Sequence, residues 1–119
     1  MLKQKESDLA KAVAEYLQLV KPKALYFHVP NERKSSPRNM AFLKARGLVP
    51  GVADLIFLSG DRCGGIELKA PGNYQSPNQK AWQLSCADHG VEYRVCRSVE
   101  EVREALVDWQ MLDGSALRT

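Results

Sequence analysis

The spacing of apolar side chains divides the chain into alternating helical and extended segments. Helical spacing predicts an amphipathic helix over residues 4–20. Serine followed by proline predicts the start of a short helix that ends at Gly47, and of another helix over residues 76–90. Ser98, with a glutamate three residues later, begins a closing helix. The apolar stripe of the first helix consists of Leu9, Val13, Leu17 and Val20.

Four shorter apolar runs predict strands, over residues 24–29, 50–58, 65–69 and 91–97. A turn-rich linker joins the second run to the third, so these two strands are expected to form a hairpin. A helix separates the third run from the fourth, which favours a parallel, right-handed crossover. The pattern predicts an α/β fold in which helices flank a mixed sheet.

The hairpin carries the candidate chemistry. Alternation along its second strand puts Glu67 and Lys69 on one face, opposite the apolar Ile66 and Leu68. If the hairpin pairs around its turn, Asp54 can lie near Glu67. Two adjacent carboxylates repel each other unless a cation lies between them. An acidic pair with a neighbouring lysine is what metal-assisted phosphodiester hydrolysis requires.

Two further polar residues have both a structural and a functional interpretation. Glu6 falls near the middle of the apolar stripe of the first helix, where a charge is unusual. A carboxylate in the first turn also suits the helix dipole, which would explain Glu6 without any chemistry. Gln79 completes a capping box with Ser76, and this role alone would account for it.

The segment around the short helix is the most basic part of the chain. Its five cations are Arg33, Lys34, Arg38, Lys44 and Arg46. A solvated surface is the simple interpretation of such a cluster. Beside a candidate phosphodiester site, contact with nucleic-acid phosphates becomes the stronger one.

Composition limits the remaining possibilities. A chain of 119 residues with 45% hydrophobic residues predicts one globular domain, over residues 1–112, followed by a loose tail over 113–119. No apolar run approaches a membrane span or a signal peptide, so a cytoplasmic location is expected. Three widely spaced cysteines and two histidines argue against a structural zinc site. The net charge of +3 permits a polyanionic partner without requiring one.

Four motifs occur in an order and at spacings that resemble a known family. The chain resembles the PD-(D/E)XK nuclease superfamily, specifically the stand-alone VRR-NUC domains of bacteria and their phages. One departure is that three residues separate Pro50 from Asp54, whereas the superfamily name implies that they are adjacent. The motifs are Glu6-Ser7, Pro50-Gly51-Val52-Ala53-Asp54, Ile66-Glu67-Leu68-Lys69 and Ser76-Pro77-Asn78-Gln79.

The resemblance implies a restriction-endonuclease-like αβββαβ core with an extra short helix and a C-terminal helix. It implies that Asp54, Glu67 and the Leu68 carbonyl bind Mg²⁺ or Mn²⁺. Lys69 would position the attacking water, Glu6 would act in a supporting position or through water, and Gln79 would orient Lys69, the water or the phosphate.

The implied function is a metal-dependent DNA endonuclease, selective for branched DNA such as four-way junctions, in a bacterial or phage-infected cell. The alternatives are a nuclease for flaps, ends or single strands, a DNA-binding module with an idle site, and a metal-independent acid/base enzyme. A symmetric homodimer is expected because two symmetric cuts require two sites. The short helix or the closing helix would supply the dimer surface.

Overall fold

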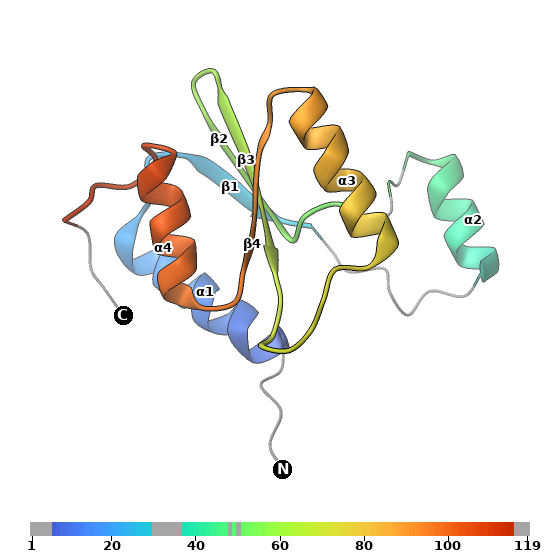
Figure 1. The fold of residues 1–119 in the computed structure, drawn as a ribbon, viewed down its shortest axis with the longest axis horizontal. Helices are drawn as coiled ribbons and strands as arrows, with labels where there is room; N and C mark the ends of the chain where they lie inside the picture. The colour runs from blue at the N-terminus through green and yellow to red at the C-terminus, as the bar shows by residue number, and fades with distance from the viewer. Residues whose placement is uncertain (1–5, 30–36, 48, 50, 116–119) are drawn as a thin grey trace, which may run out of the picture.

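The computed structural model describes residues 6–29, 37–47, 49 and 51–115. Their order is helix, strand, helix, two strands, helix, strand, helix, as the sequence pattern predicts (Figure 1). The elements are α1 (Glu6–Val20), β1 (Leu25–His28), α2 (Pro37–Ala45), β2 (Leu55–Ser59), β3 (Arg62–Leu68), α3 (Pro77–Asp88), β4 (Glu92–Cys96) and α4 (Val99–Asp108).

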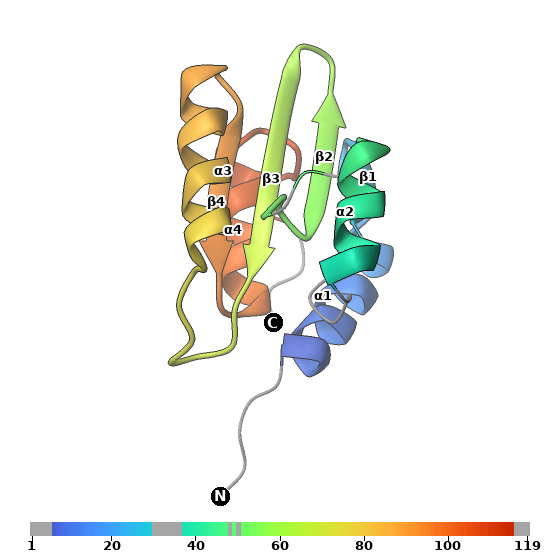
Figure 2. The same ribbon diagram turned by 90° about the vertical axis from the view of Figure 1, so that its right-hand side faces the viewer.

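The four strands form one mixed sheet in the order β1-β2-β3-β4. β2 pairs antiparallel with both β1 and β3, whereas β3 and β4 run parallel because α3 connects them. Helices α1 and α4 cover one face of the sheet, and α3 lies on the other (Figures 1 and 2). This arrangement confirms the predicted α/β class with a mixed, helix-flanked sheet.

The main hydrophobic core lies between the sheet and the pair α1 and α4. Alternate residues of β2 and β3 point into this core, and the apolar stripe of α1 packs against them. The closing helix contributes Val102 and Leu106, and Trp109 follows at its end; all three are buried within the chain. The proposal that α4 supplies an apolar dimer surface is therefore wrong, because these side chains cover the protein's own sheet.

The hairpin turn is shorter than the sequence pattern predicts. Ser59 pairs with Arg62, which leaves Gly60 and Asp61 as a two-residue turn. Gly60 has a φ of 58°, the left-handed conformation that such tight hairpins need at this position. The extra pairing extends β3 back to Arg62 and joins the two strands of the site rigidly.

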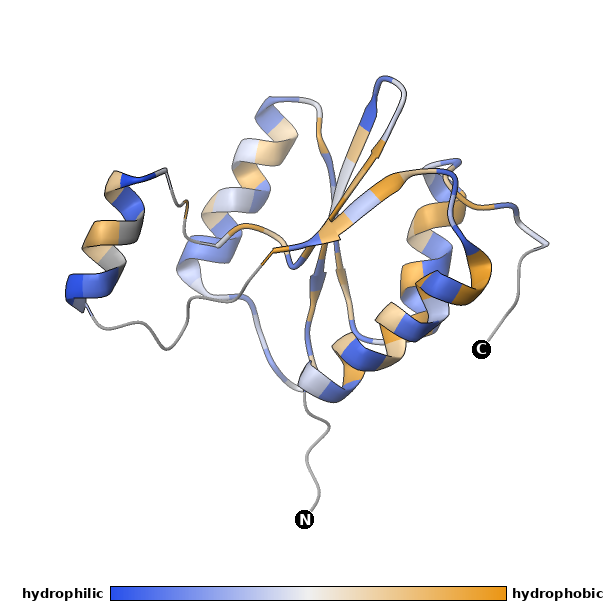
Figure 3. Ribbon diagram, turned by 180° about the vertical axis from the view of Figure 1, so that it is seen from behind, coloured by the Kyte–Doolittle hydropathy of each residue, from blue (hydrophilic) through white to orange (hydrophobic). Residues whose placement is uncertain are grey.

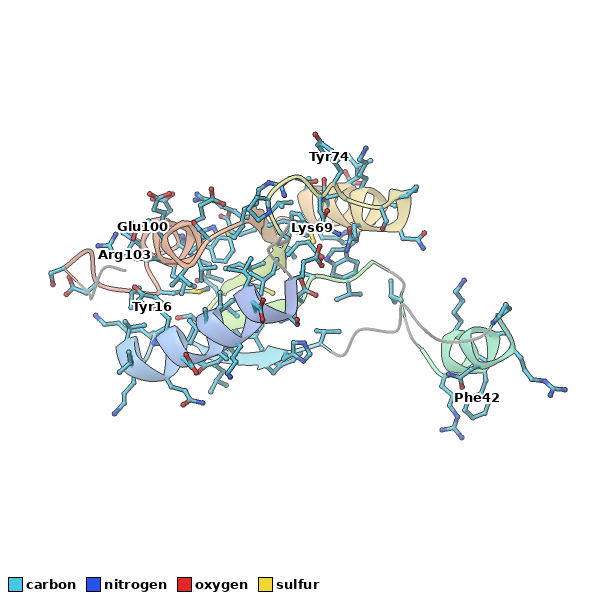
Figure 4. All side chains as sticks on the ribbon, turned by 90° about the horizontal axis from the view of Figure 1, so that it is seen from below. Tyr16, Phe42, Lys69, Tyr74, Glu100 and Arg103 are labelled. Carbon is cyan, nitrogen blue, oxygen red and sulfur yellow. The ribbon has the colours of Figure 1, made fainter. Side chains whose placement is uncertain are left out.

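Part of the surface is apolar and uncovered. β1 is an edge strand, and the side chains of Leu25 and Phe27 are 76% and 51% exposed. Figure 3 shows β1 as a largely apolar strand. α2 stands apart from the sheet, on the side of α3, and its Phe42 is exposed (Figures 1 and 4). In α2, the other candidate for a dimer surface, this exposed aromatic ring remains available.

Candidate active site

Strand pairing brings the two hairpin carboxylates together. Leu55 pairs with Ile66, so Asp54 and Glu67 occupy the next opposed positions where β2 begins and β3 ends. The Leu68 amide donates a hydrogen bond of 2.7 Å to Asp54 Oδ2, which fixes the Asp54 side chain against β3. The structure thus places Asp54, Glu67 and the backbone of Leu68 at one point of the sheet.

Glu67 is buried, although the sequence pattern places it on a polar face. Its side chain projects toward α3, and only 2% of the residue is exposed. The difference arises because α3 packs over this part of the sheet, which strand alternation cannot predict. The Glu67 Oε1 atom is buried and accepts from no N–H group among the described residues, while the Glu67 side chain shares a proton with the Asp54 carboxyl group. A buried, unpaired carboxylate oxygen is costly unless a proton or a cation satisfies it.

The electrostatics of this pair favour a bound positive charge. Burial, together with the nearby Asp54 carboxylate, raises the pKa of Glu67 to about 8. Burial also raises the pKa of Asp54, while the hydrogen bond from the Leu68 amide acts in the opposite direction. Each carboxyl group therefore holds a proton more tightly than it would in water, and a divalent cation can replace those protons.

Gln79 completes the capping box that the sequence predicts and also contacts Glu67, whereas its expected role toward Lys69, the water or the phosphate stays a prediction. Its side-chain Oε1 accepts a hydrogen bond of 2.8 Å from the Ser76 amide and so completes the capping box of α3. This contact turns the Nε2 group toward the sheet, where it donates a 2.7 Å hydrogen bond to Glu67 Oε2. The start of α3 thus fixes one oxygen of Glu67 and leaves Oε1 as the unpaired one.

Lys69 and Glu6 meet beside the carboxylate pair. Lys69 lies just past the end of β3, is 6% exposed, and is held through its amide, which donates to the Cys96 carbonyl. Its Nζ atom lies 4.0 Å from Glu6 Oε2, at the first turn of α1. Figure 4 views the molecule from this end and shows Lys69 between α1 and α3. The structure therefore brings Glu6, from the first helix of the chain, into the same site as Lys69.

Two residues near the site have roles that the sequence analysis does not assign. Gly51 has a φ of 84°, and a Cβ added there would lie 2.3 Å from the carbonyl oxygen of Asn78 on α3. Only glycine allows the segment before Asp54 to pass this close to α3. The Asn73 side chain donates a 3.0 Å hydrogen bond to Glu6 Oε2. The Pro50-Gly51 pair signals a turn, but no local signal identifies Asn73.

The basic residues predicted to contact DNA are only partly placed. Arg38, Lys44 and Arg46 lie on or just after α2 and are exposed. The Arg46 guanidinium stacks over the Phe42 ring, 4.9 Å from its centroid. Arg33 and Lys34 fall outside the described residues. The placed cations thus form a surface on α2 that stands away from the carboxylate pair (Figure 4).

Comparison with known proteins agrees with this arrangement. The family model of the VRR-NUC domain matches residues 5–100, which include every candidate residue of the carboxylate site. The chain belongs to the VRR-NUC domain family. A solved structure described as a VRR_NUC domain protein has the same fold, with a TM-score of 0.74 and 20% sequence identity. The similarity covers 95% of this chain and 94% of the other. No curated protein matches the sequence.

Membership in the VRR-NUC family implies a nuclease-type function, with DNA as the substrate class. Across the described residues, no helix is long and apolar enough to span a membrane. The same part of the VRR-NUC chain contains no group of three His, Cys, Asp or Glu residues suited to a metal. The donors that converge are two carboxylates next to a backbone segment, and such oxygen ligands suit Mg²⁺ or Mn²⁺, which retain several waters.

Proposed function

We propose that this VRR-NUC domain is a metal-dependent DNA endonuclease that hydrolyses phosphodiester bonds at the Asp54–Glu67 site. The observation that carries the proposal is the buried, unpaired Glu67 Oε1 next to Asp54, in a pair whose pKa values are both raised. A purely structural carboxylate at this depth would have partners for both oxygens. A divalent cation bound by these two residues and the Leu68 carbonyl would supply the missing positive charge.

When bound, Mg²⁺ or Mn²⁺ lowers the pKa of a bound water and counters charge on the phosphate. The protein's own residues hold the carboxylates and the lysine ammonium group in place. Gln79 keeps the second Glu67 oxygen in place through its 2.7 Å hydrogen bond, and the Leu68 amide does the same for Asp54. Lys69 provides an ammonium group that can orient the attacking water and stabilise negative charge developing on the phosphate. Glu6 holds that ammonium group from the α1 side.

The test is a cleavage panel with duplex, flap, splayed-arm and four-way-junction DNA, each with Mg²⁺, Mn²⁺ or chelator. The parent protein should cut at least one substrate only when metal is present. Lys69→Met should reduce the cleavage rate about 10²–10³-fold, as removal of one transition-state contact typically does, and leave the mobility shift of DNA unchanged. Cleavage in chelator would contradict metal dependence, and DNA binding with no cleavage under any condition would favour an idle module.

We further propose that a homodimer selects branched DNA. Each chain supplies one such carboxylate site in its described residues, and two symmetric cuts in a four-way junction require two sites. With the apolar stripe of α4 used internally, α2 with its exposed Phe42 remains as the candidate surface. Light scattering at micromolar concentration should give the mass of two chains, and Phe42→Ser should reduce it to one. A monomeric parent protein would remove the junction-resolving role but not the nuclease activity.

A further inference from the structure

The loop that follows β3 forms a turn whose two ends are bridged by one guanidinium group. Residues 70–73 have proline second and glycine third, Gly72 has a φ of 88°, and the Asn73 amide donates to the Ala70 carbonyl at 3.1 Å. This is the pattern of a type II turn. Arg97 Nη1 donates to the Asn73 carbonyl at 2.9 Å and makes a longer, 3.5 Å contact with the Ala70 carbonyl.

Arg97 is itself held from the other side. It follows β4, and its amide donates a 2.6 Å hydrogen bond to the side chain of Glu101 in the first turn of α4. The Glu101 amide in turn donates to the Ser98 side chain, which caps the helix. The start of α4 therefore fixes the backbone of Arg97, and the guanidinium of Arg97 fixes the turn.

The held turn reaches the candidate active site through Asn73. Its side-chain amide donates to Glu6 Oε2 at 3.0 Å, and this same oxygen lies 4.0 Å from Lys69 Nζ. A glutamate side chain in the first turn of a helix has several rotamers available. The hydrogen bond from Asn73 and the nearby Lys69 ammonium group, both at Oε2, restrict Glu6 to fewer of them. The contacts thus run from Arg97 to Asn73, from Asn73 to Glu6, and from Glu6 to Lys69.

We propose that Arg97 and Asn73 are positioning residues of the nuclease, which together hold Glu6 against Lys69 and thereby set the orientation of the lysine ammonium group. This inference rests on the proposed function of the carboxylate site. Asn73 contacts the site through Glu6, and Arg97 acts on it through Asn73. Both carbonyl contacts come from Arg97 Nη1, whose two N–H groups can each donate to one oxygen.

Three single variants and one control test the proposal in the full chain. Asn73→Ala and Arg97→Gln should each lower kcat at least tenfold, as loss of a hydrogen bond to a charged group can, with KM for DNA changed less than threefold. Glu6→Ala, which removes both carboxylate oxygens, should lower kcat by a similar or larger factor. The matched control is Arg94→Gln, which removes a guanidinium from β4, the strand that Arg97 follows, and breaks its exposed ion pair with Asp108.

The decisive measurement is a double-mutant cycle. In the Glu6→Ala background, Arg97→Gln should cause no further loss of kcat, because both changes interrupt the same chain of contacts. A merely structural role of Arg97 predicts losses that multiply. Multiplying losses, or a kcat for Arg97→Gln equal to that of Arg94→Gln, would overturn the proposal. Asn73→Ala keeps it falsifiable if Arg97→Gln does not fold, because Asn73 is exposed.

A second readout does not depend on cleavage. The side-chain amide signal of Asn73 in a proton–nitrogen NMR spectrum, assigned by its loss in Asn73→Ala, should be shifted from free asparagine in the parent protein. It should move to the free position in Arg97→Gln and in Glu6→Ala, which removes the oxygen that accepts from Asn73, and stay in place in Arg94→Gln. An unmoved signal overturns the contact chain. If the parent protein cuts no DNA, the proposed function fails, whereas the contact chain is still decided by this signal.

Discussion

Replacing Glu67 by glutamine should stabilise the metal-free protein at pH 8, although it removes a proposed metal ligand. Glutamine keeps the shape of the side chain and its ability to accept from Gln79. It removes the need to ionise a carboxyl group that is 2% exposed and lies beside Asp54. The substitution therefore separates the cost of burying this charge from the value of its metal contact.

The raised pKa of Glu67 explains why the substitution should increase the free energy of unfolding. The folded-state pKa of Glu67 is about 8, above the ordinary value of 4.5, so the folded protein binds the proton more tightly than the unfolded chain does. Stability from this group is complete below pH 4.5 and is lost as the pH rises from 4.5 to 8. At 1.36 kcal/mol per pKa unit the full loss would be about 5 kcal/mol. Because Asp54 shares the proton, we expect Glu67→Gln to gain about 2 kcal/mol at pH 8, or roughly 6–8 °C in Tm.

The assay is urea and thermal unfolding in chelator at pH 5 and pH 8, repeated at pH 8 with Mn²⁺. The advantage of Glu67→Gln should be small at pH 5 and largest at pH 8. Metal at 1,000 times its Kd should stabilise only the parent protein, by about 4 kcal/mol, and so reverse the order. Glu92→Gln, an exposed carboxylate on the neighbouring strand, is the control and should change stability by less than about 0.5 kcal/mol. A Glu67→Gln protein less stable than the parent at pH 8 in chelator would refute the reasoning.

Three further outcomes are expected. Gly51→Ala should lower the free energy of unfolding by about 2 kcal/mol or more and reduce cleavage, because the added Cβ would overlap the backbone of α3. The control is Gly60→Ala, which has a φ of 58° but open space around it, and urea unfolding should distinguish the two variants. Asp54→Asn should weaken metal binding at least tenfold in calorimetry, and unchanged binding would show that Asp54 is not a ligand. Neutralising the three exposed cations on or just after α2 should reduce the slope of log affinity for DNA against log salt by about 2–3, whereas an unchanged slope would place the DNA elsewhere.

The elements whose signals are local were predictable from sequence. Ser76 and Gln79 form the capping box that their spacing indicates, and the helix they begin ends near the predicted glycine. The apolar stripe of α1 points into the core as its helical spacing requires. The position of Asp54 opposite Glu67 follows from hairpin pairing, which needs only alternation and a turn.

Features that depend on packing between distant segments were not predictable. Strand alternation assigns Glu67 to a polar face, but its burial depends on where α3 packs. The closing helix illustrates a second limit, since an apolar stripe does not reveal whether it covers the protein's own sheet or a partner. Ser98 caps α4 as expected, yet the Glu101 side chain accepts from the Arg97 amide rather than from that of Ser98. This shift by one residue directs Arg97 toward the turn after β3.

The burial of Glu67 connects stability with function in one argument. A protein selected only for stability would not hold two carboxyl groups together at this depth, because the metal-free state must bind protons there or bear the repulsion. In the proposed function a cation bound to both groups would remove that penalty, and the free energy lost by the metal-free fold at neutral pH would reappear as affinity for metal. The same reasoning explains why Gln79 and the Leu68 amide each occupy one carboxylate oxygen. They fix the side chains while Glu67 Oε1 accepts from no N–H group among the described residues, so that a cation could replace the proton that Glu67 shares with Asp54.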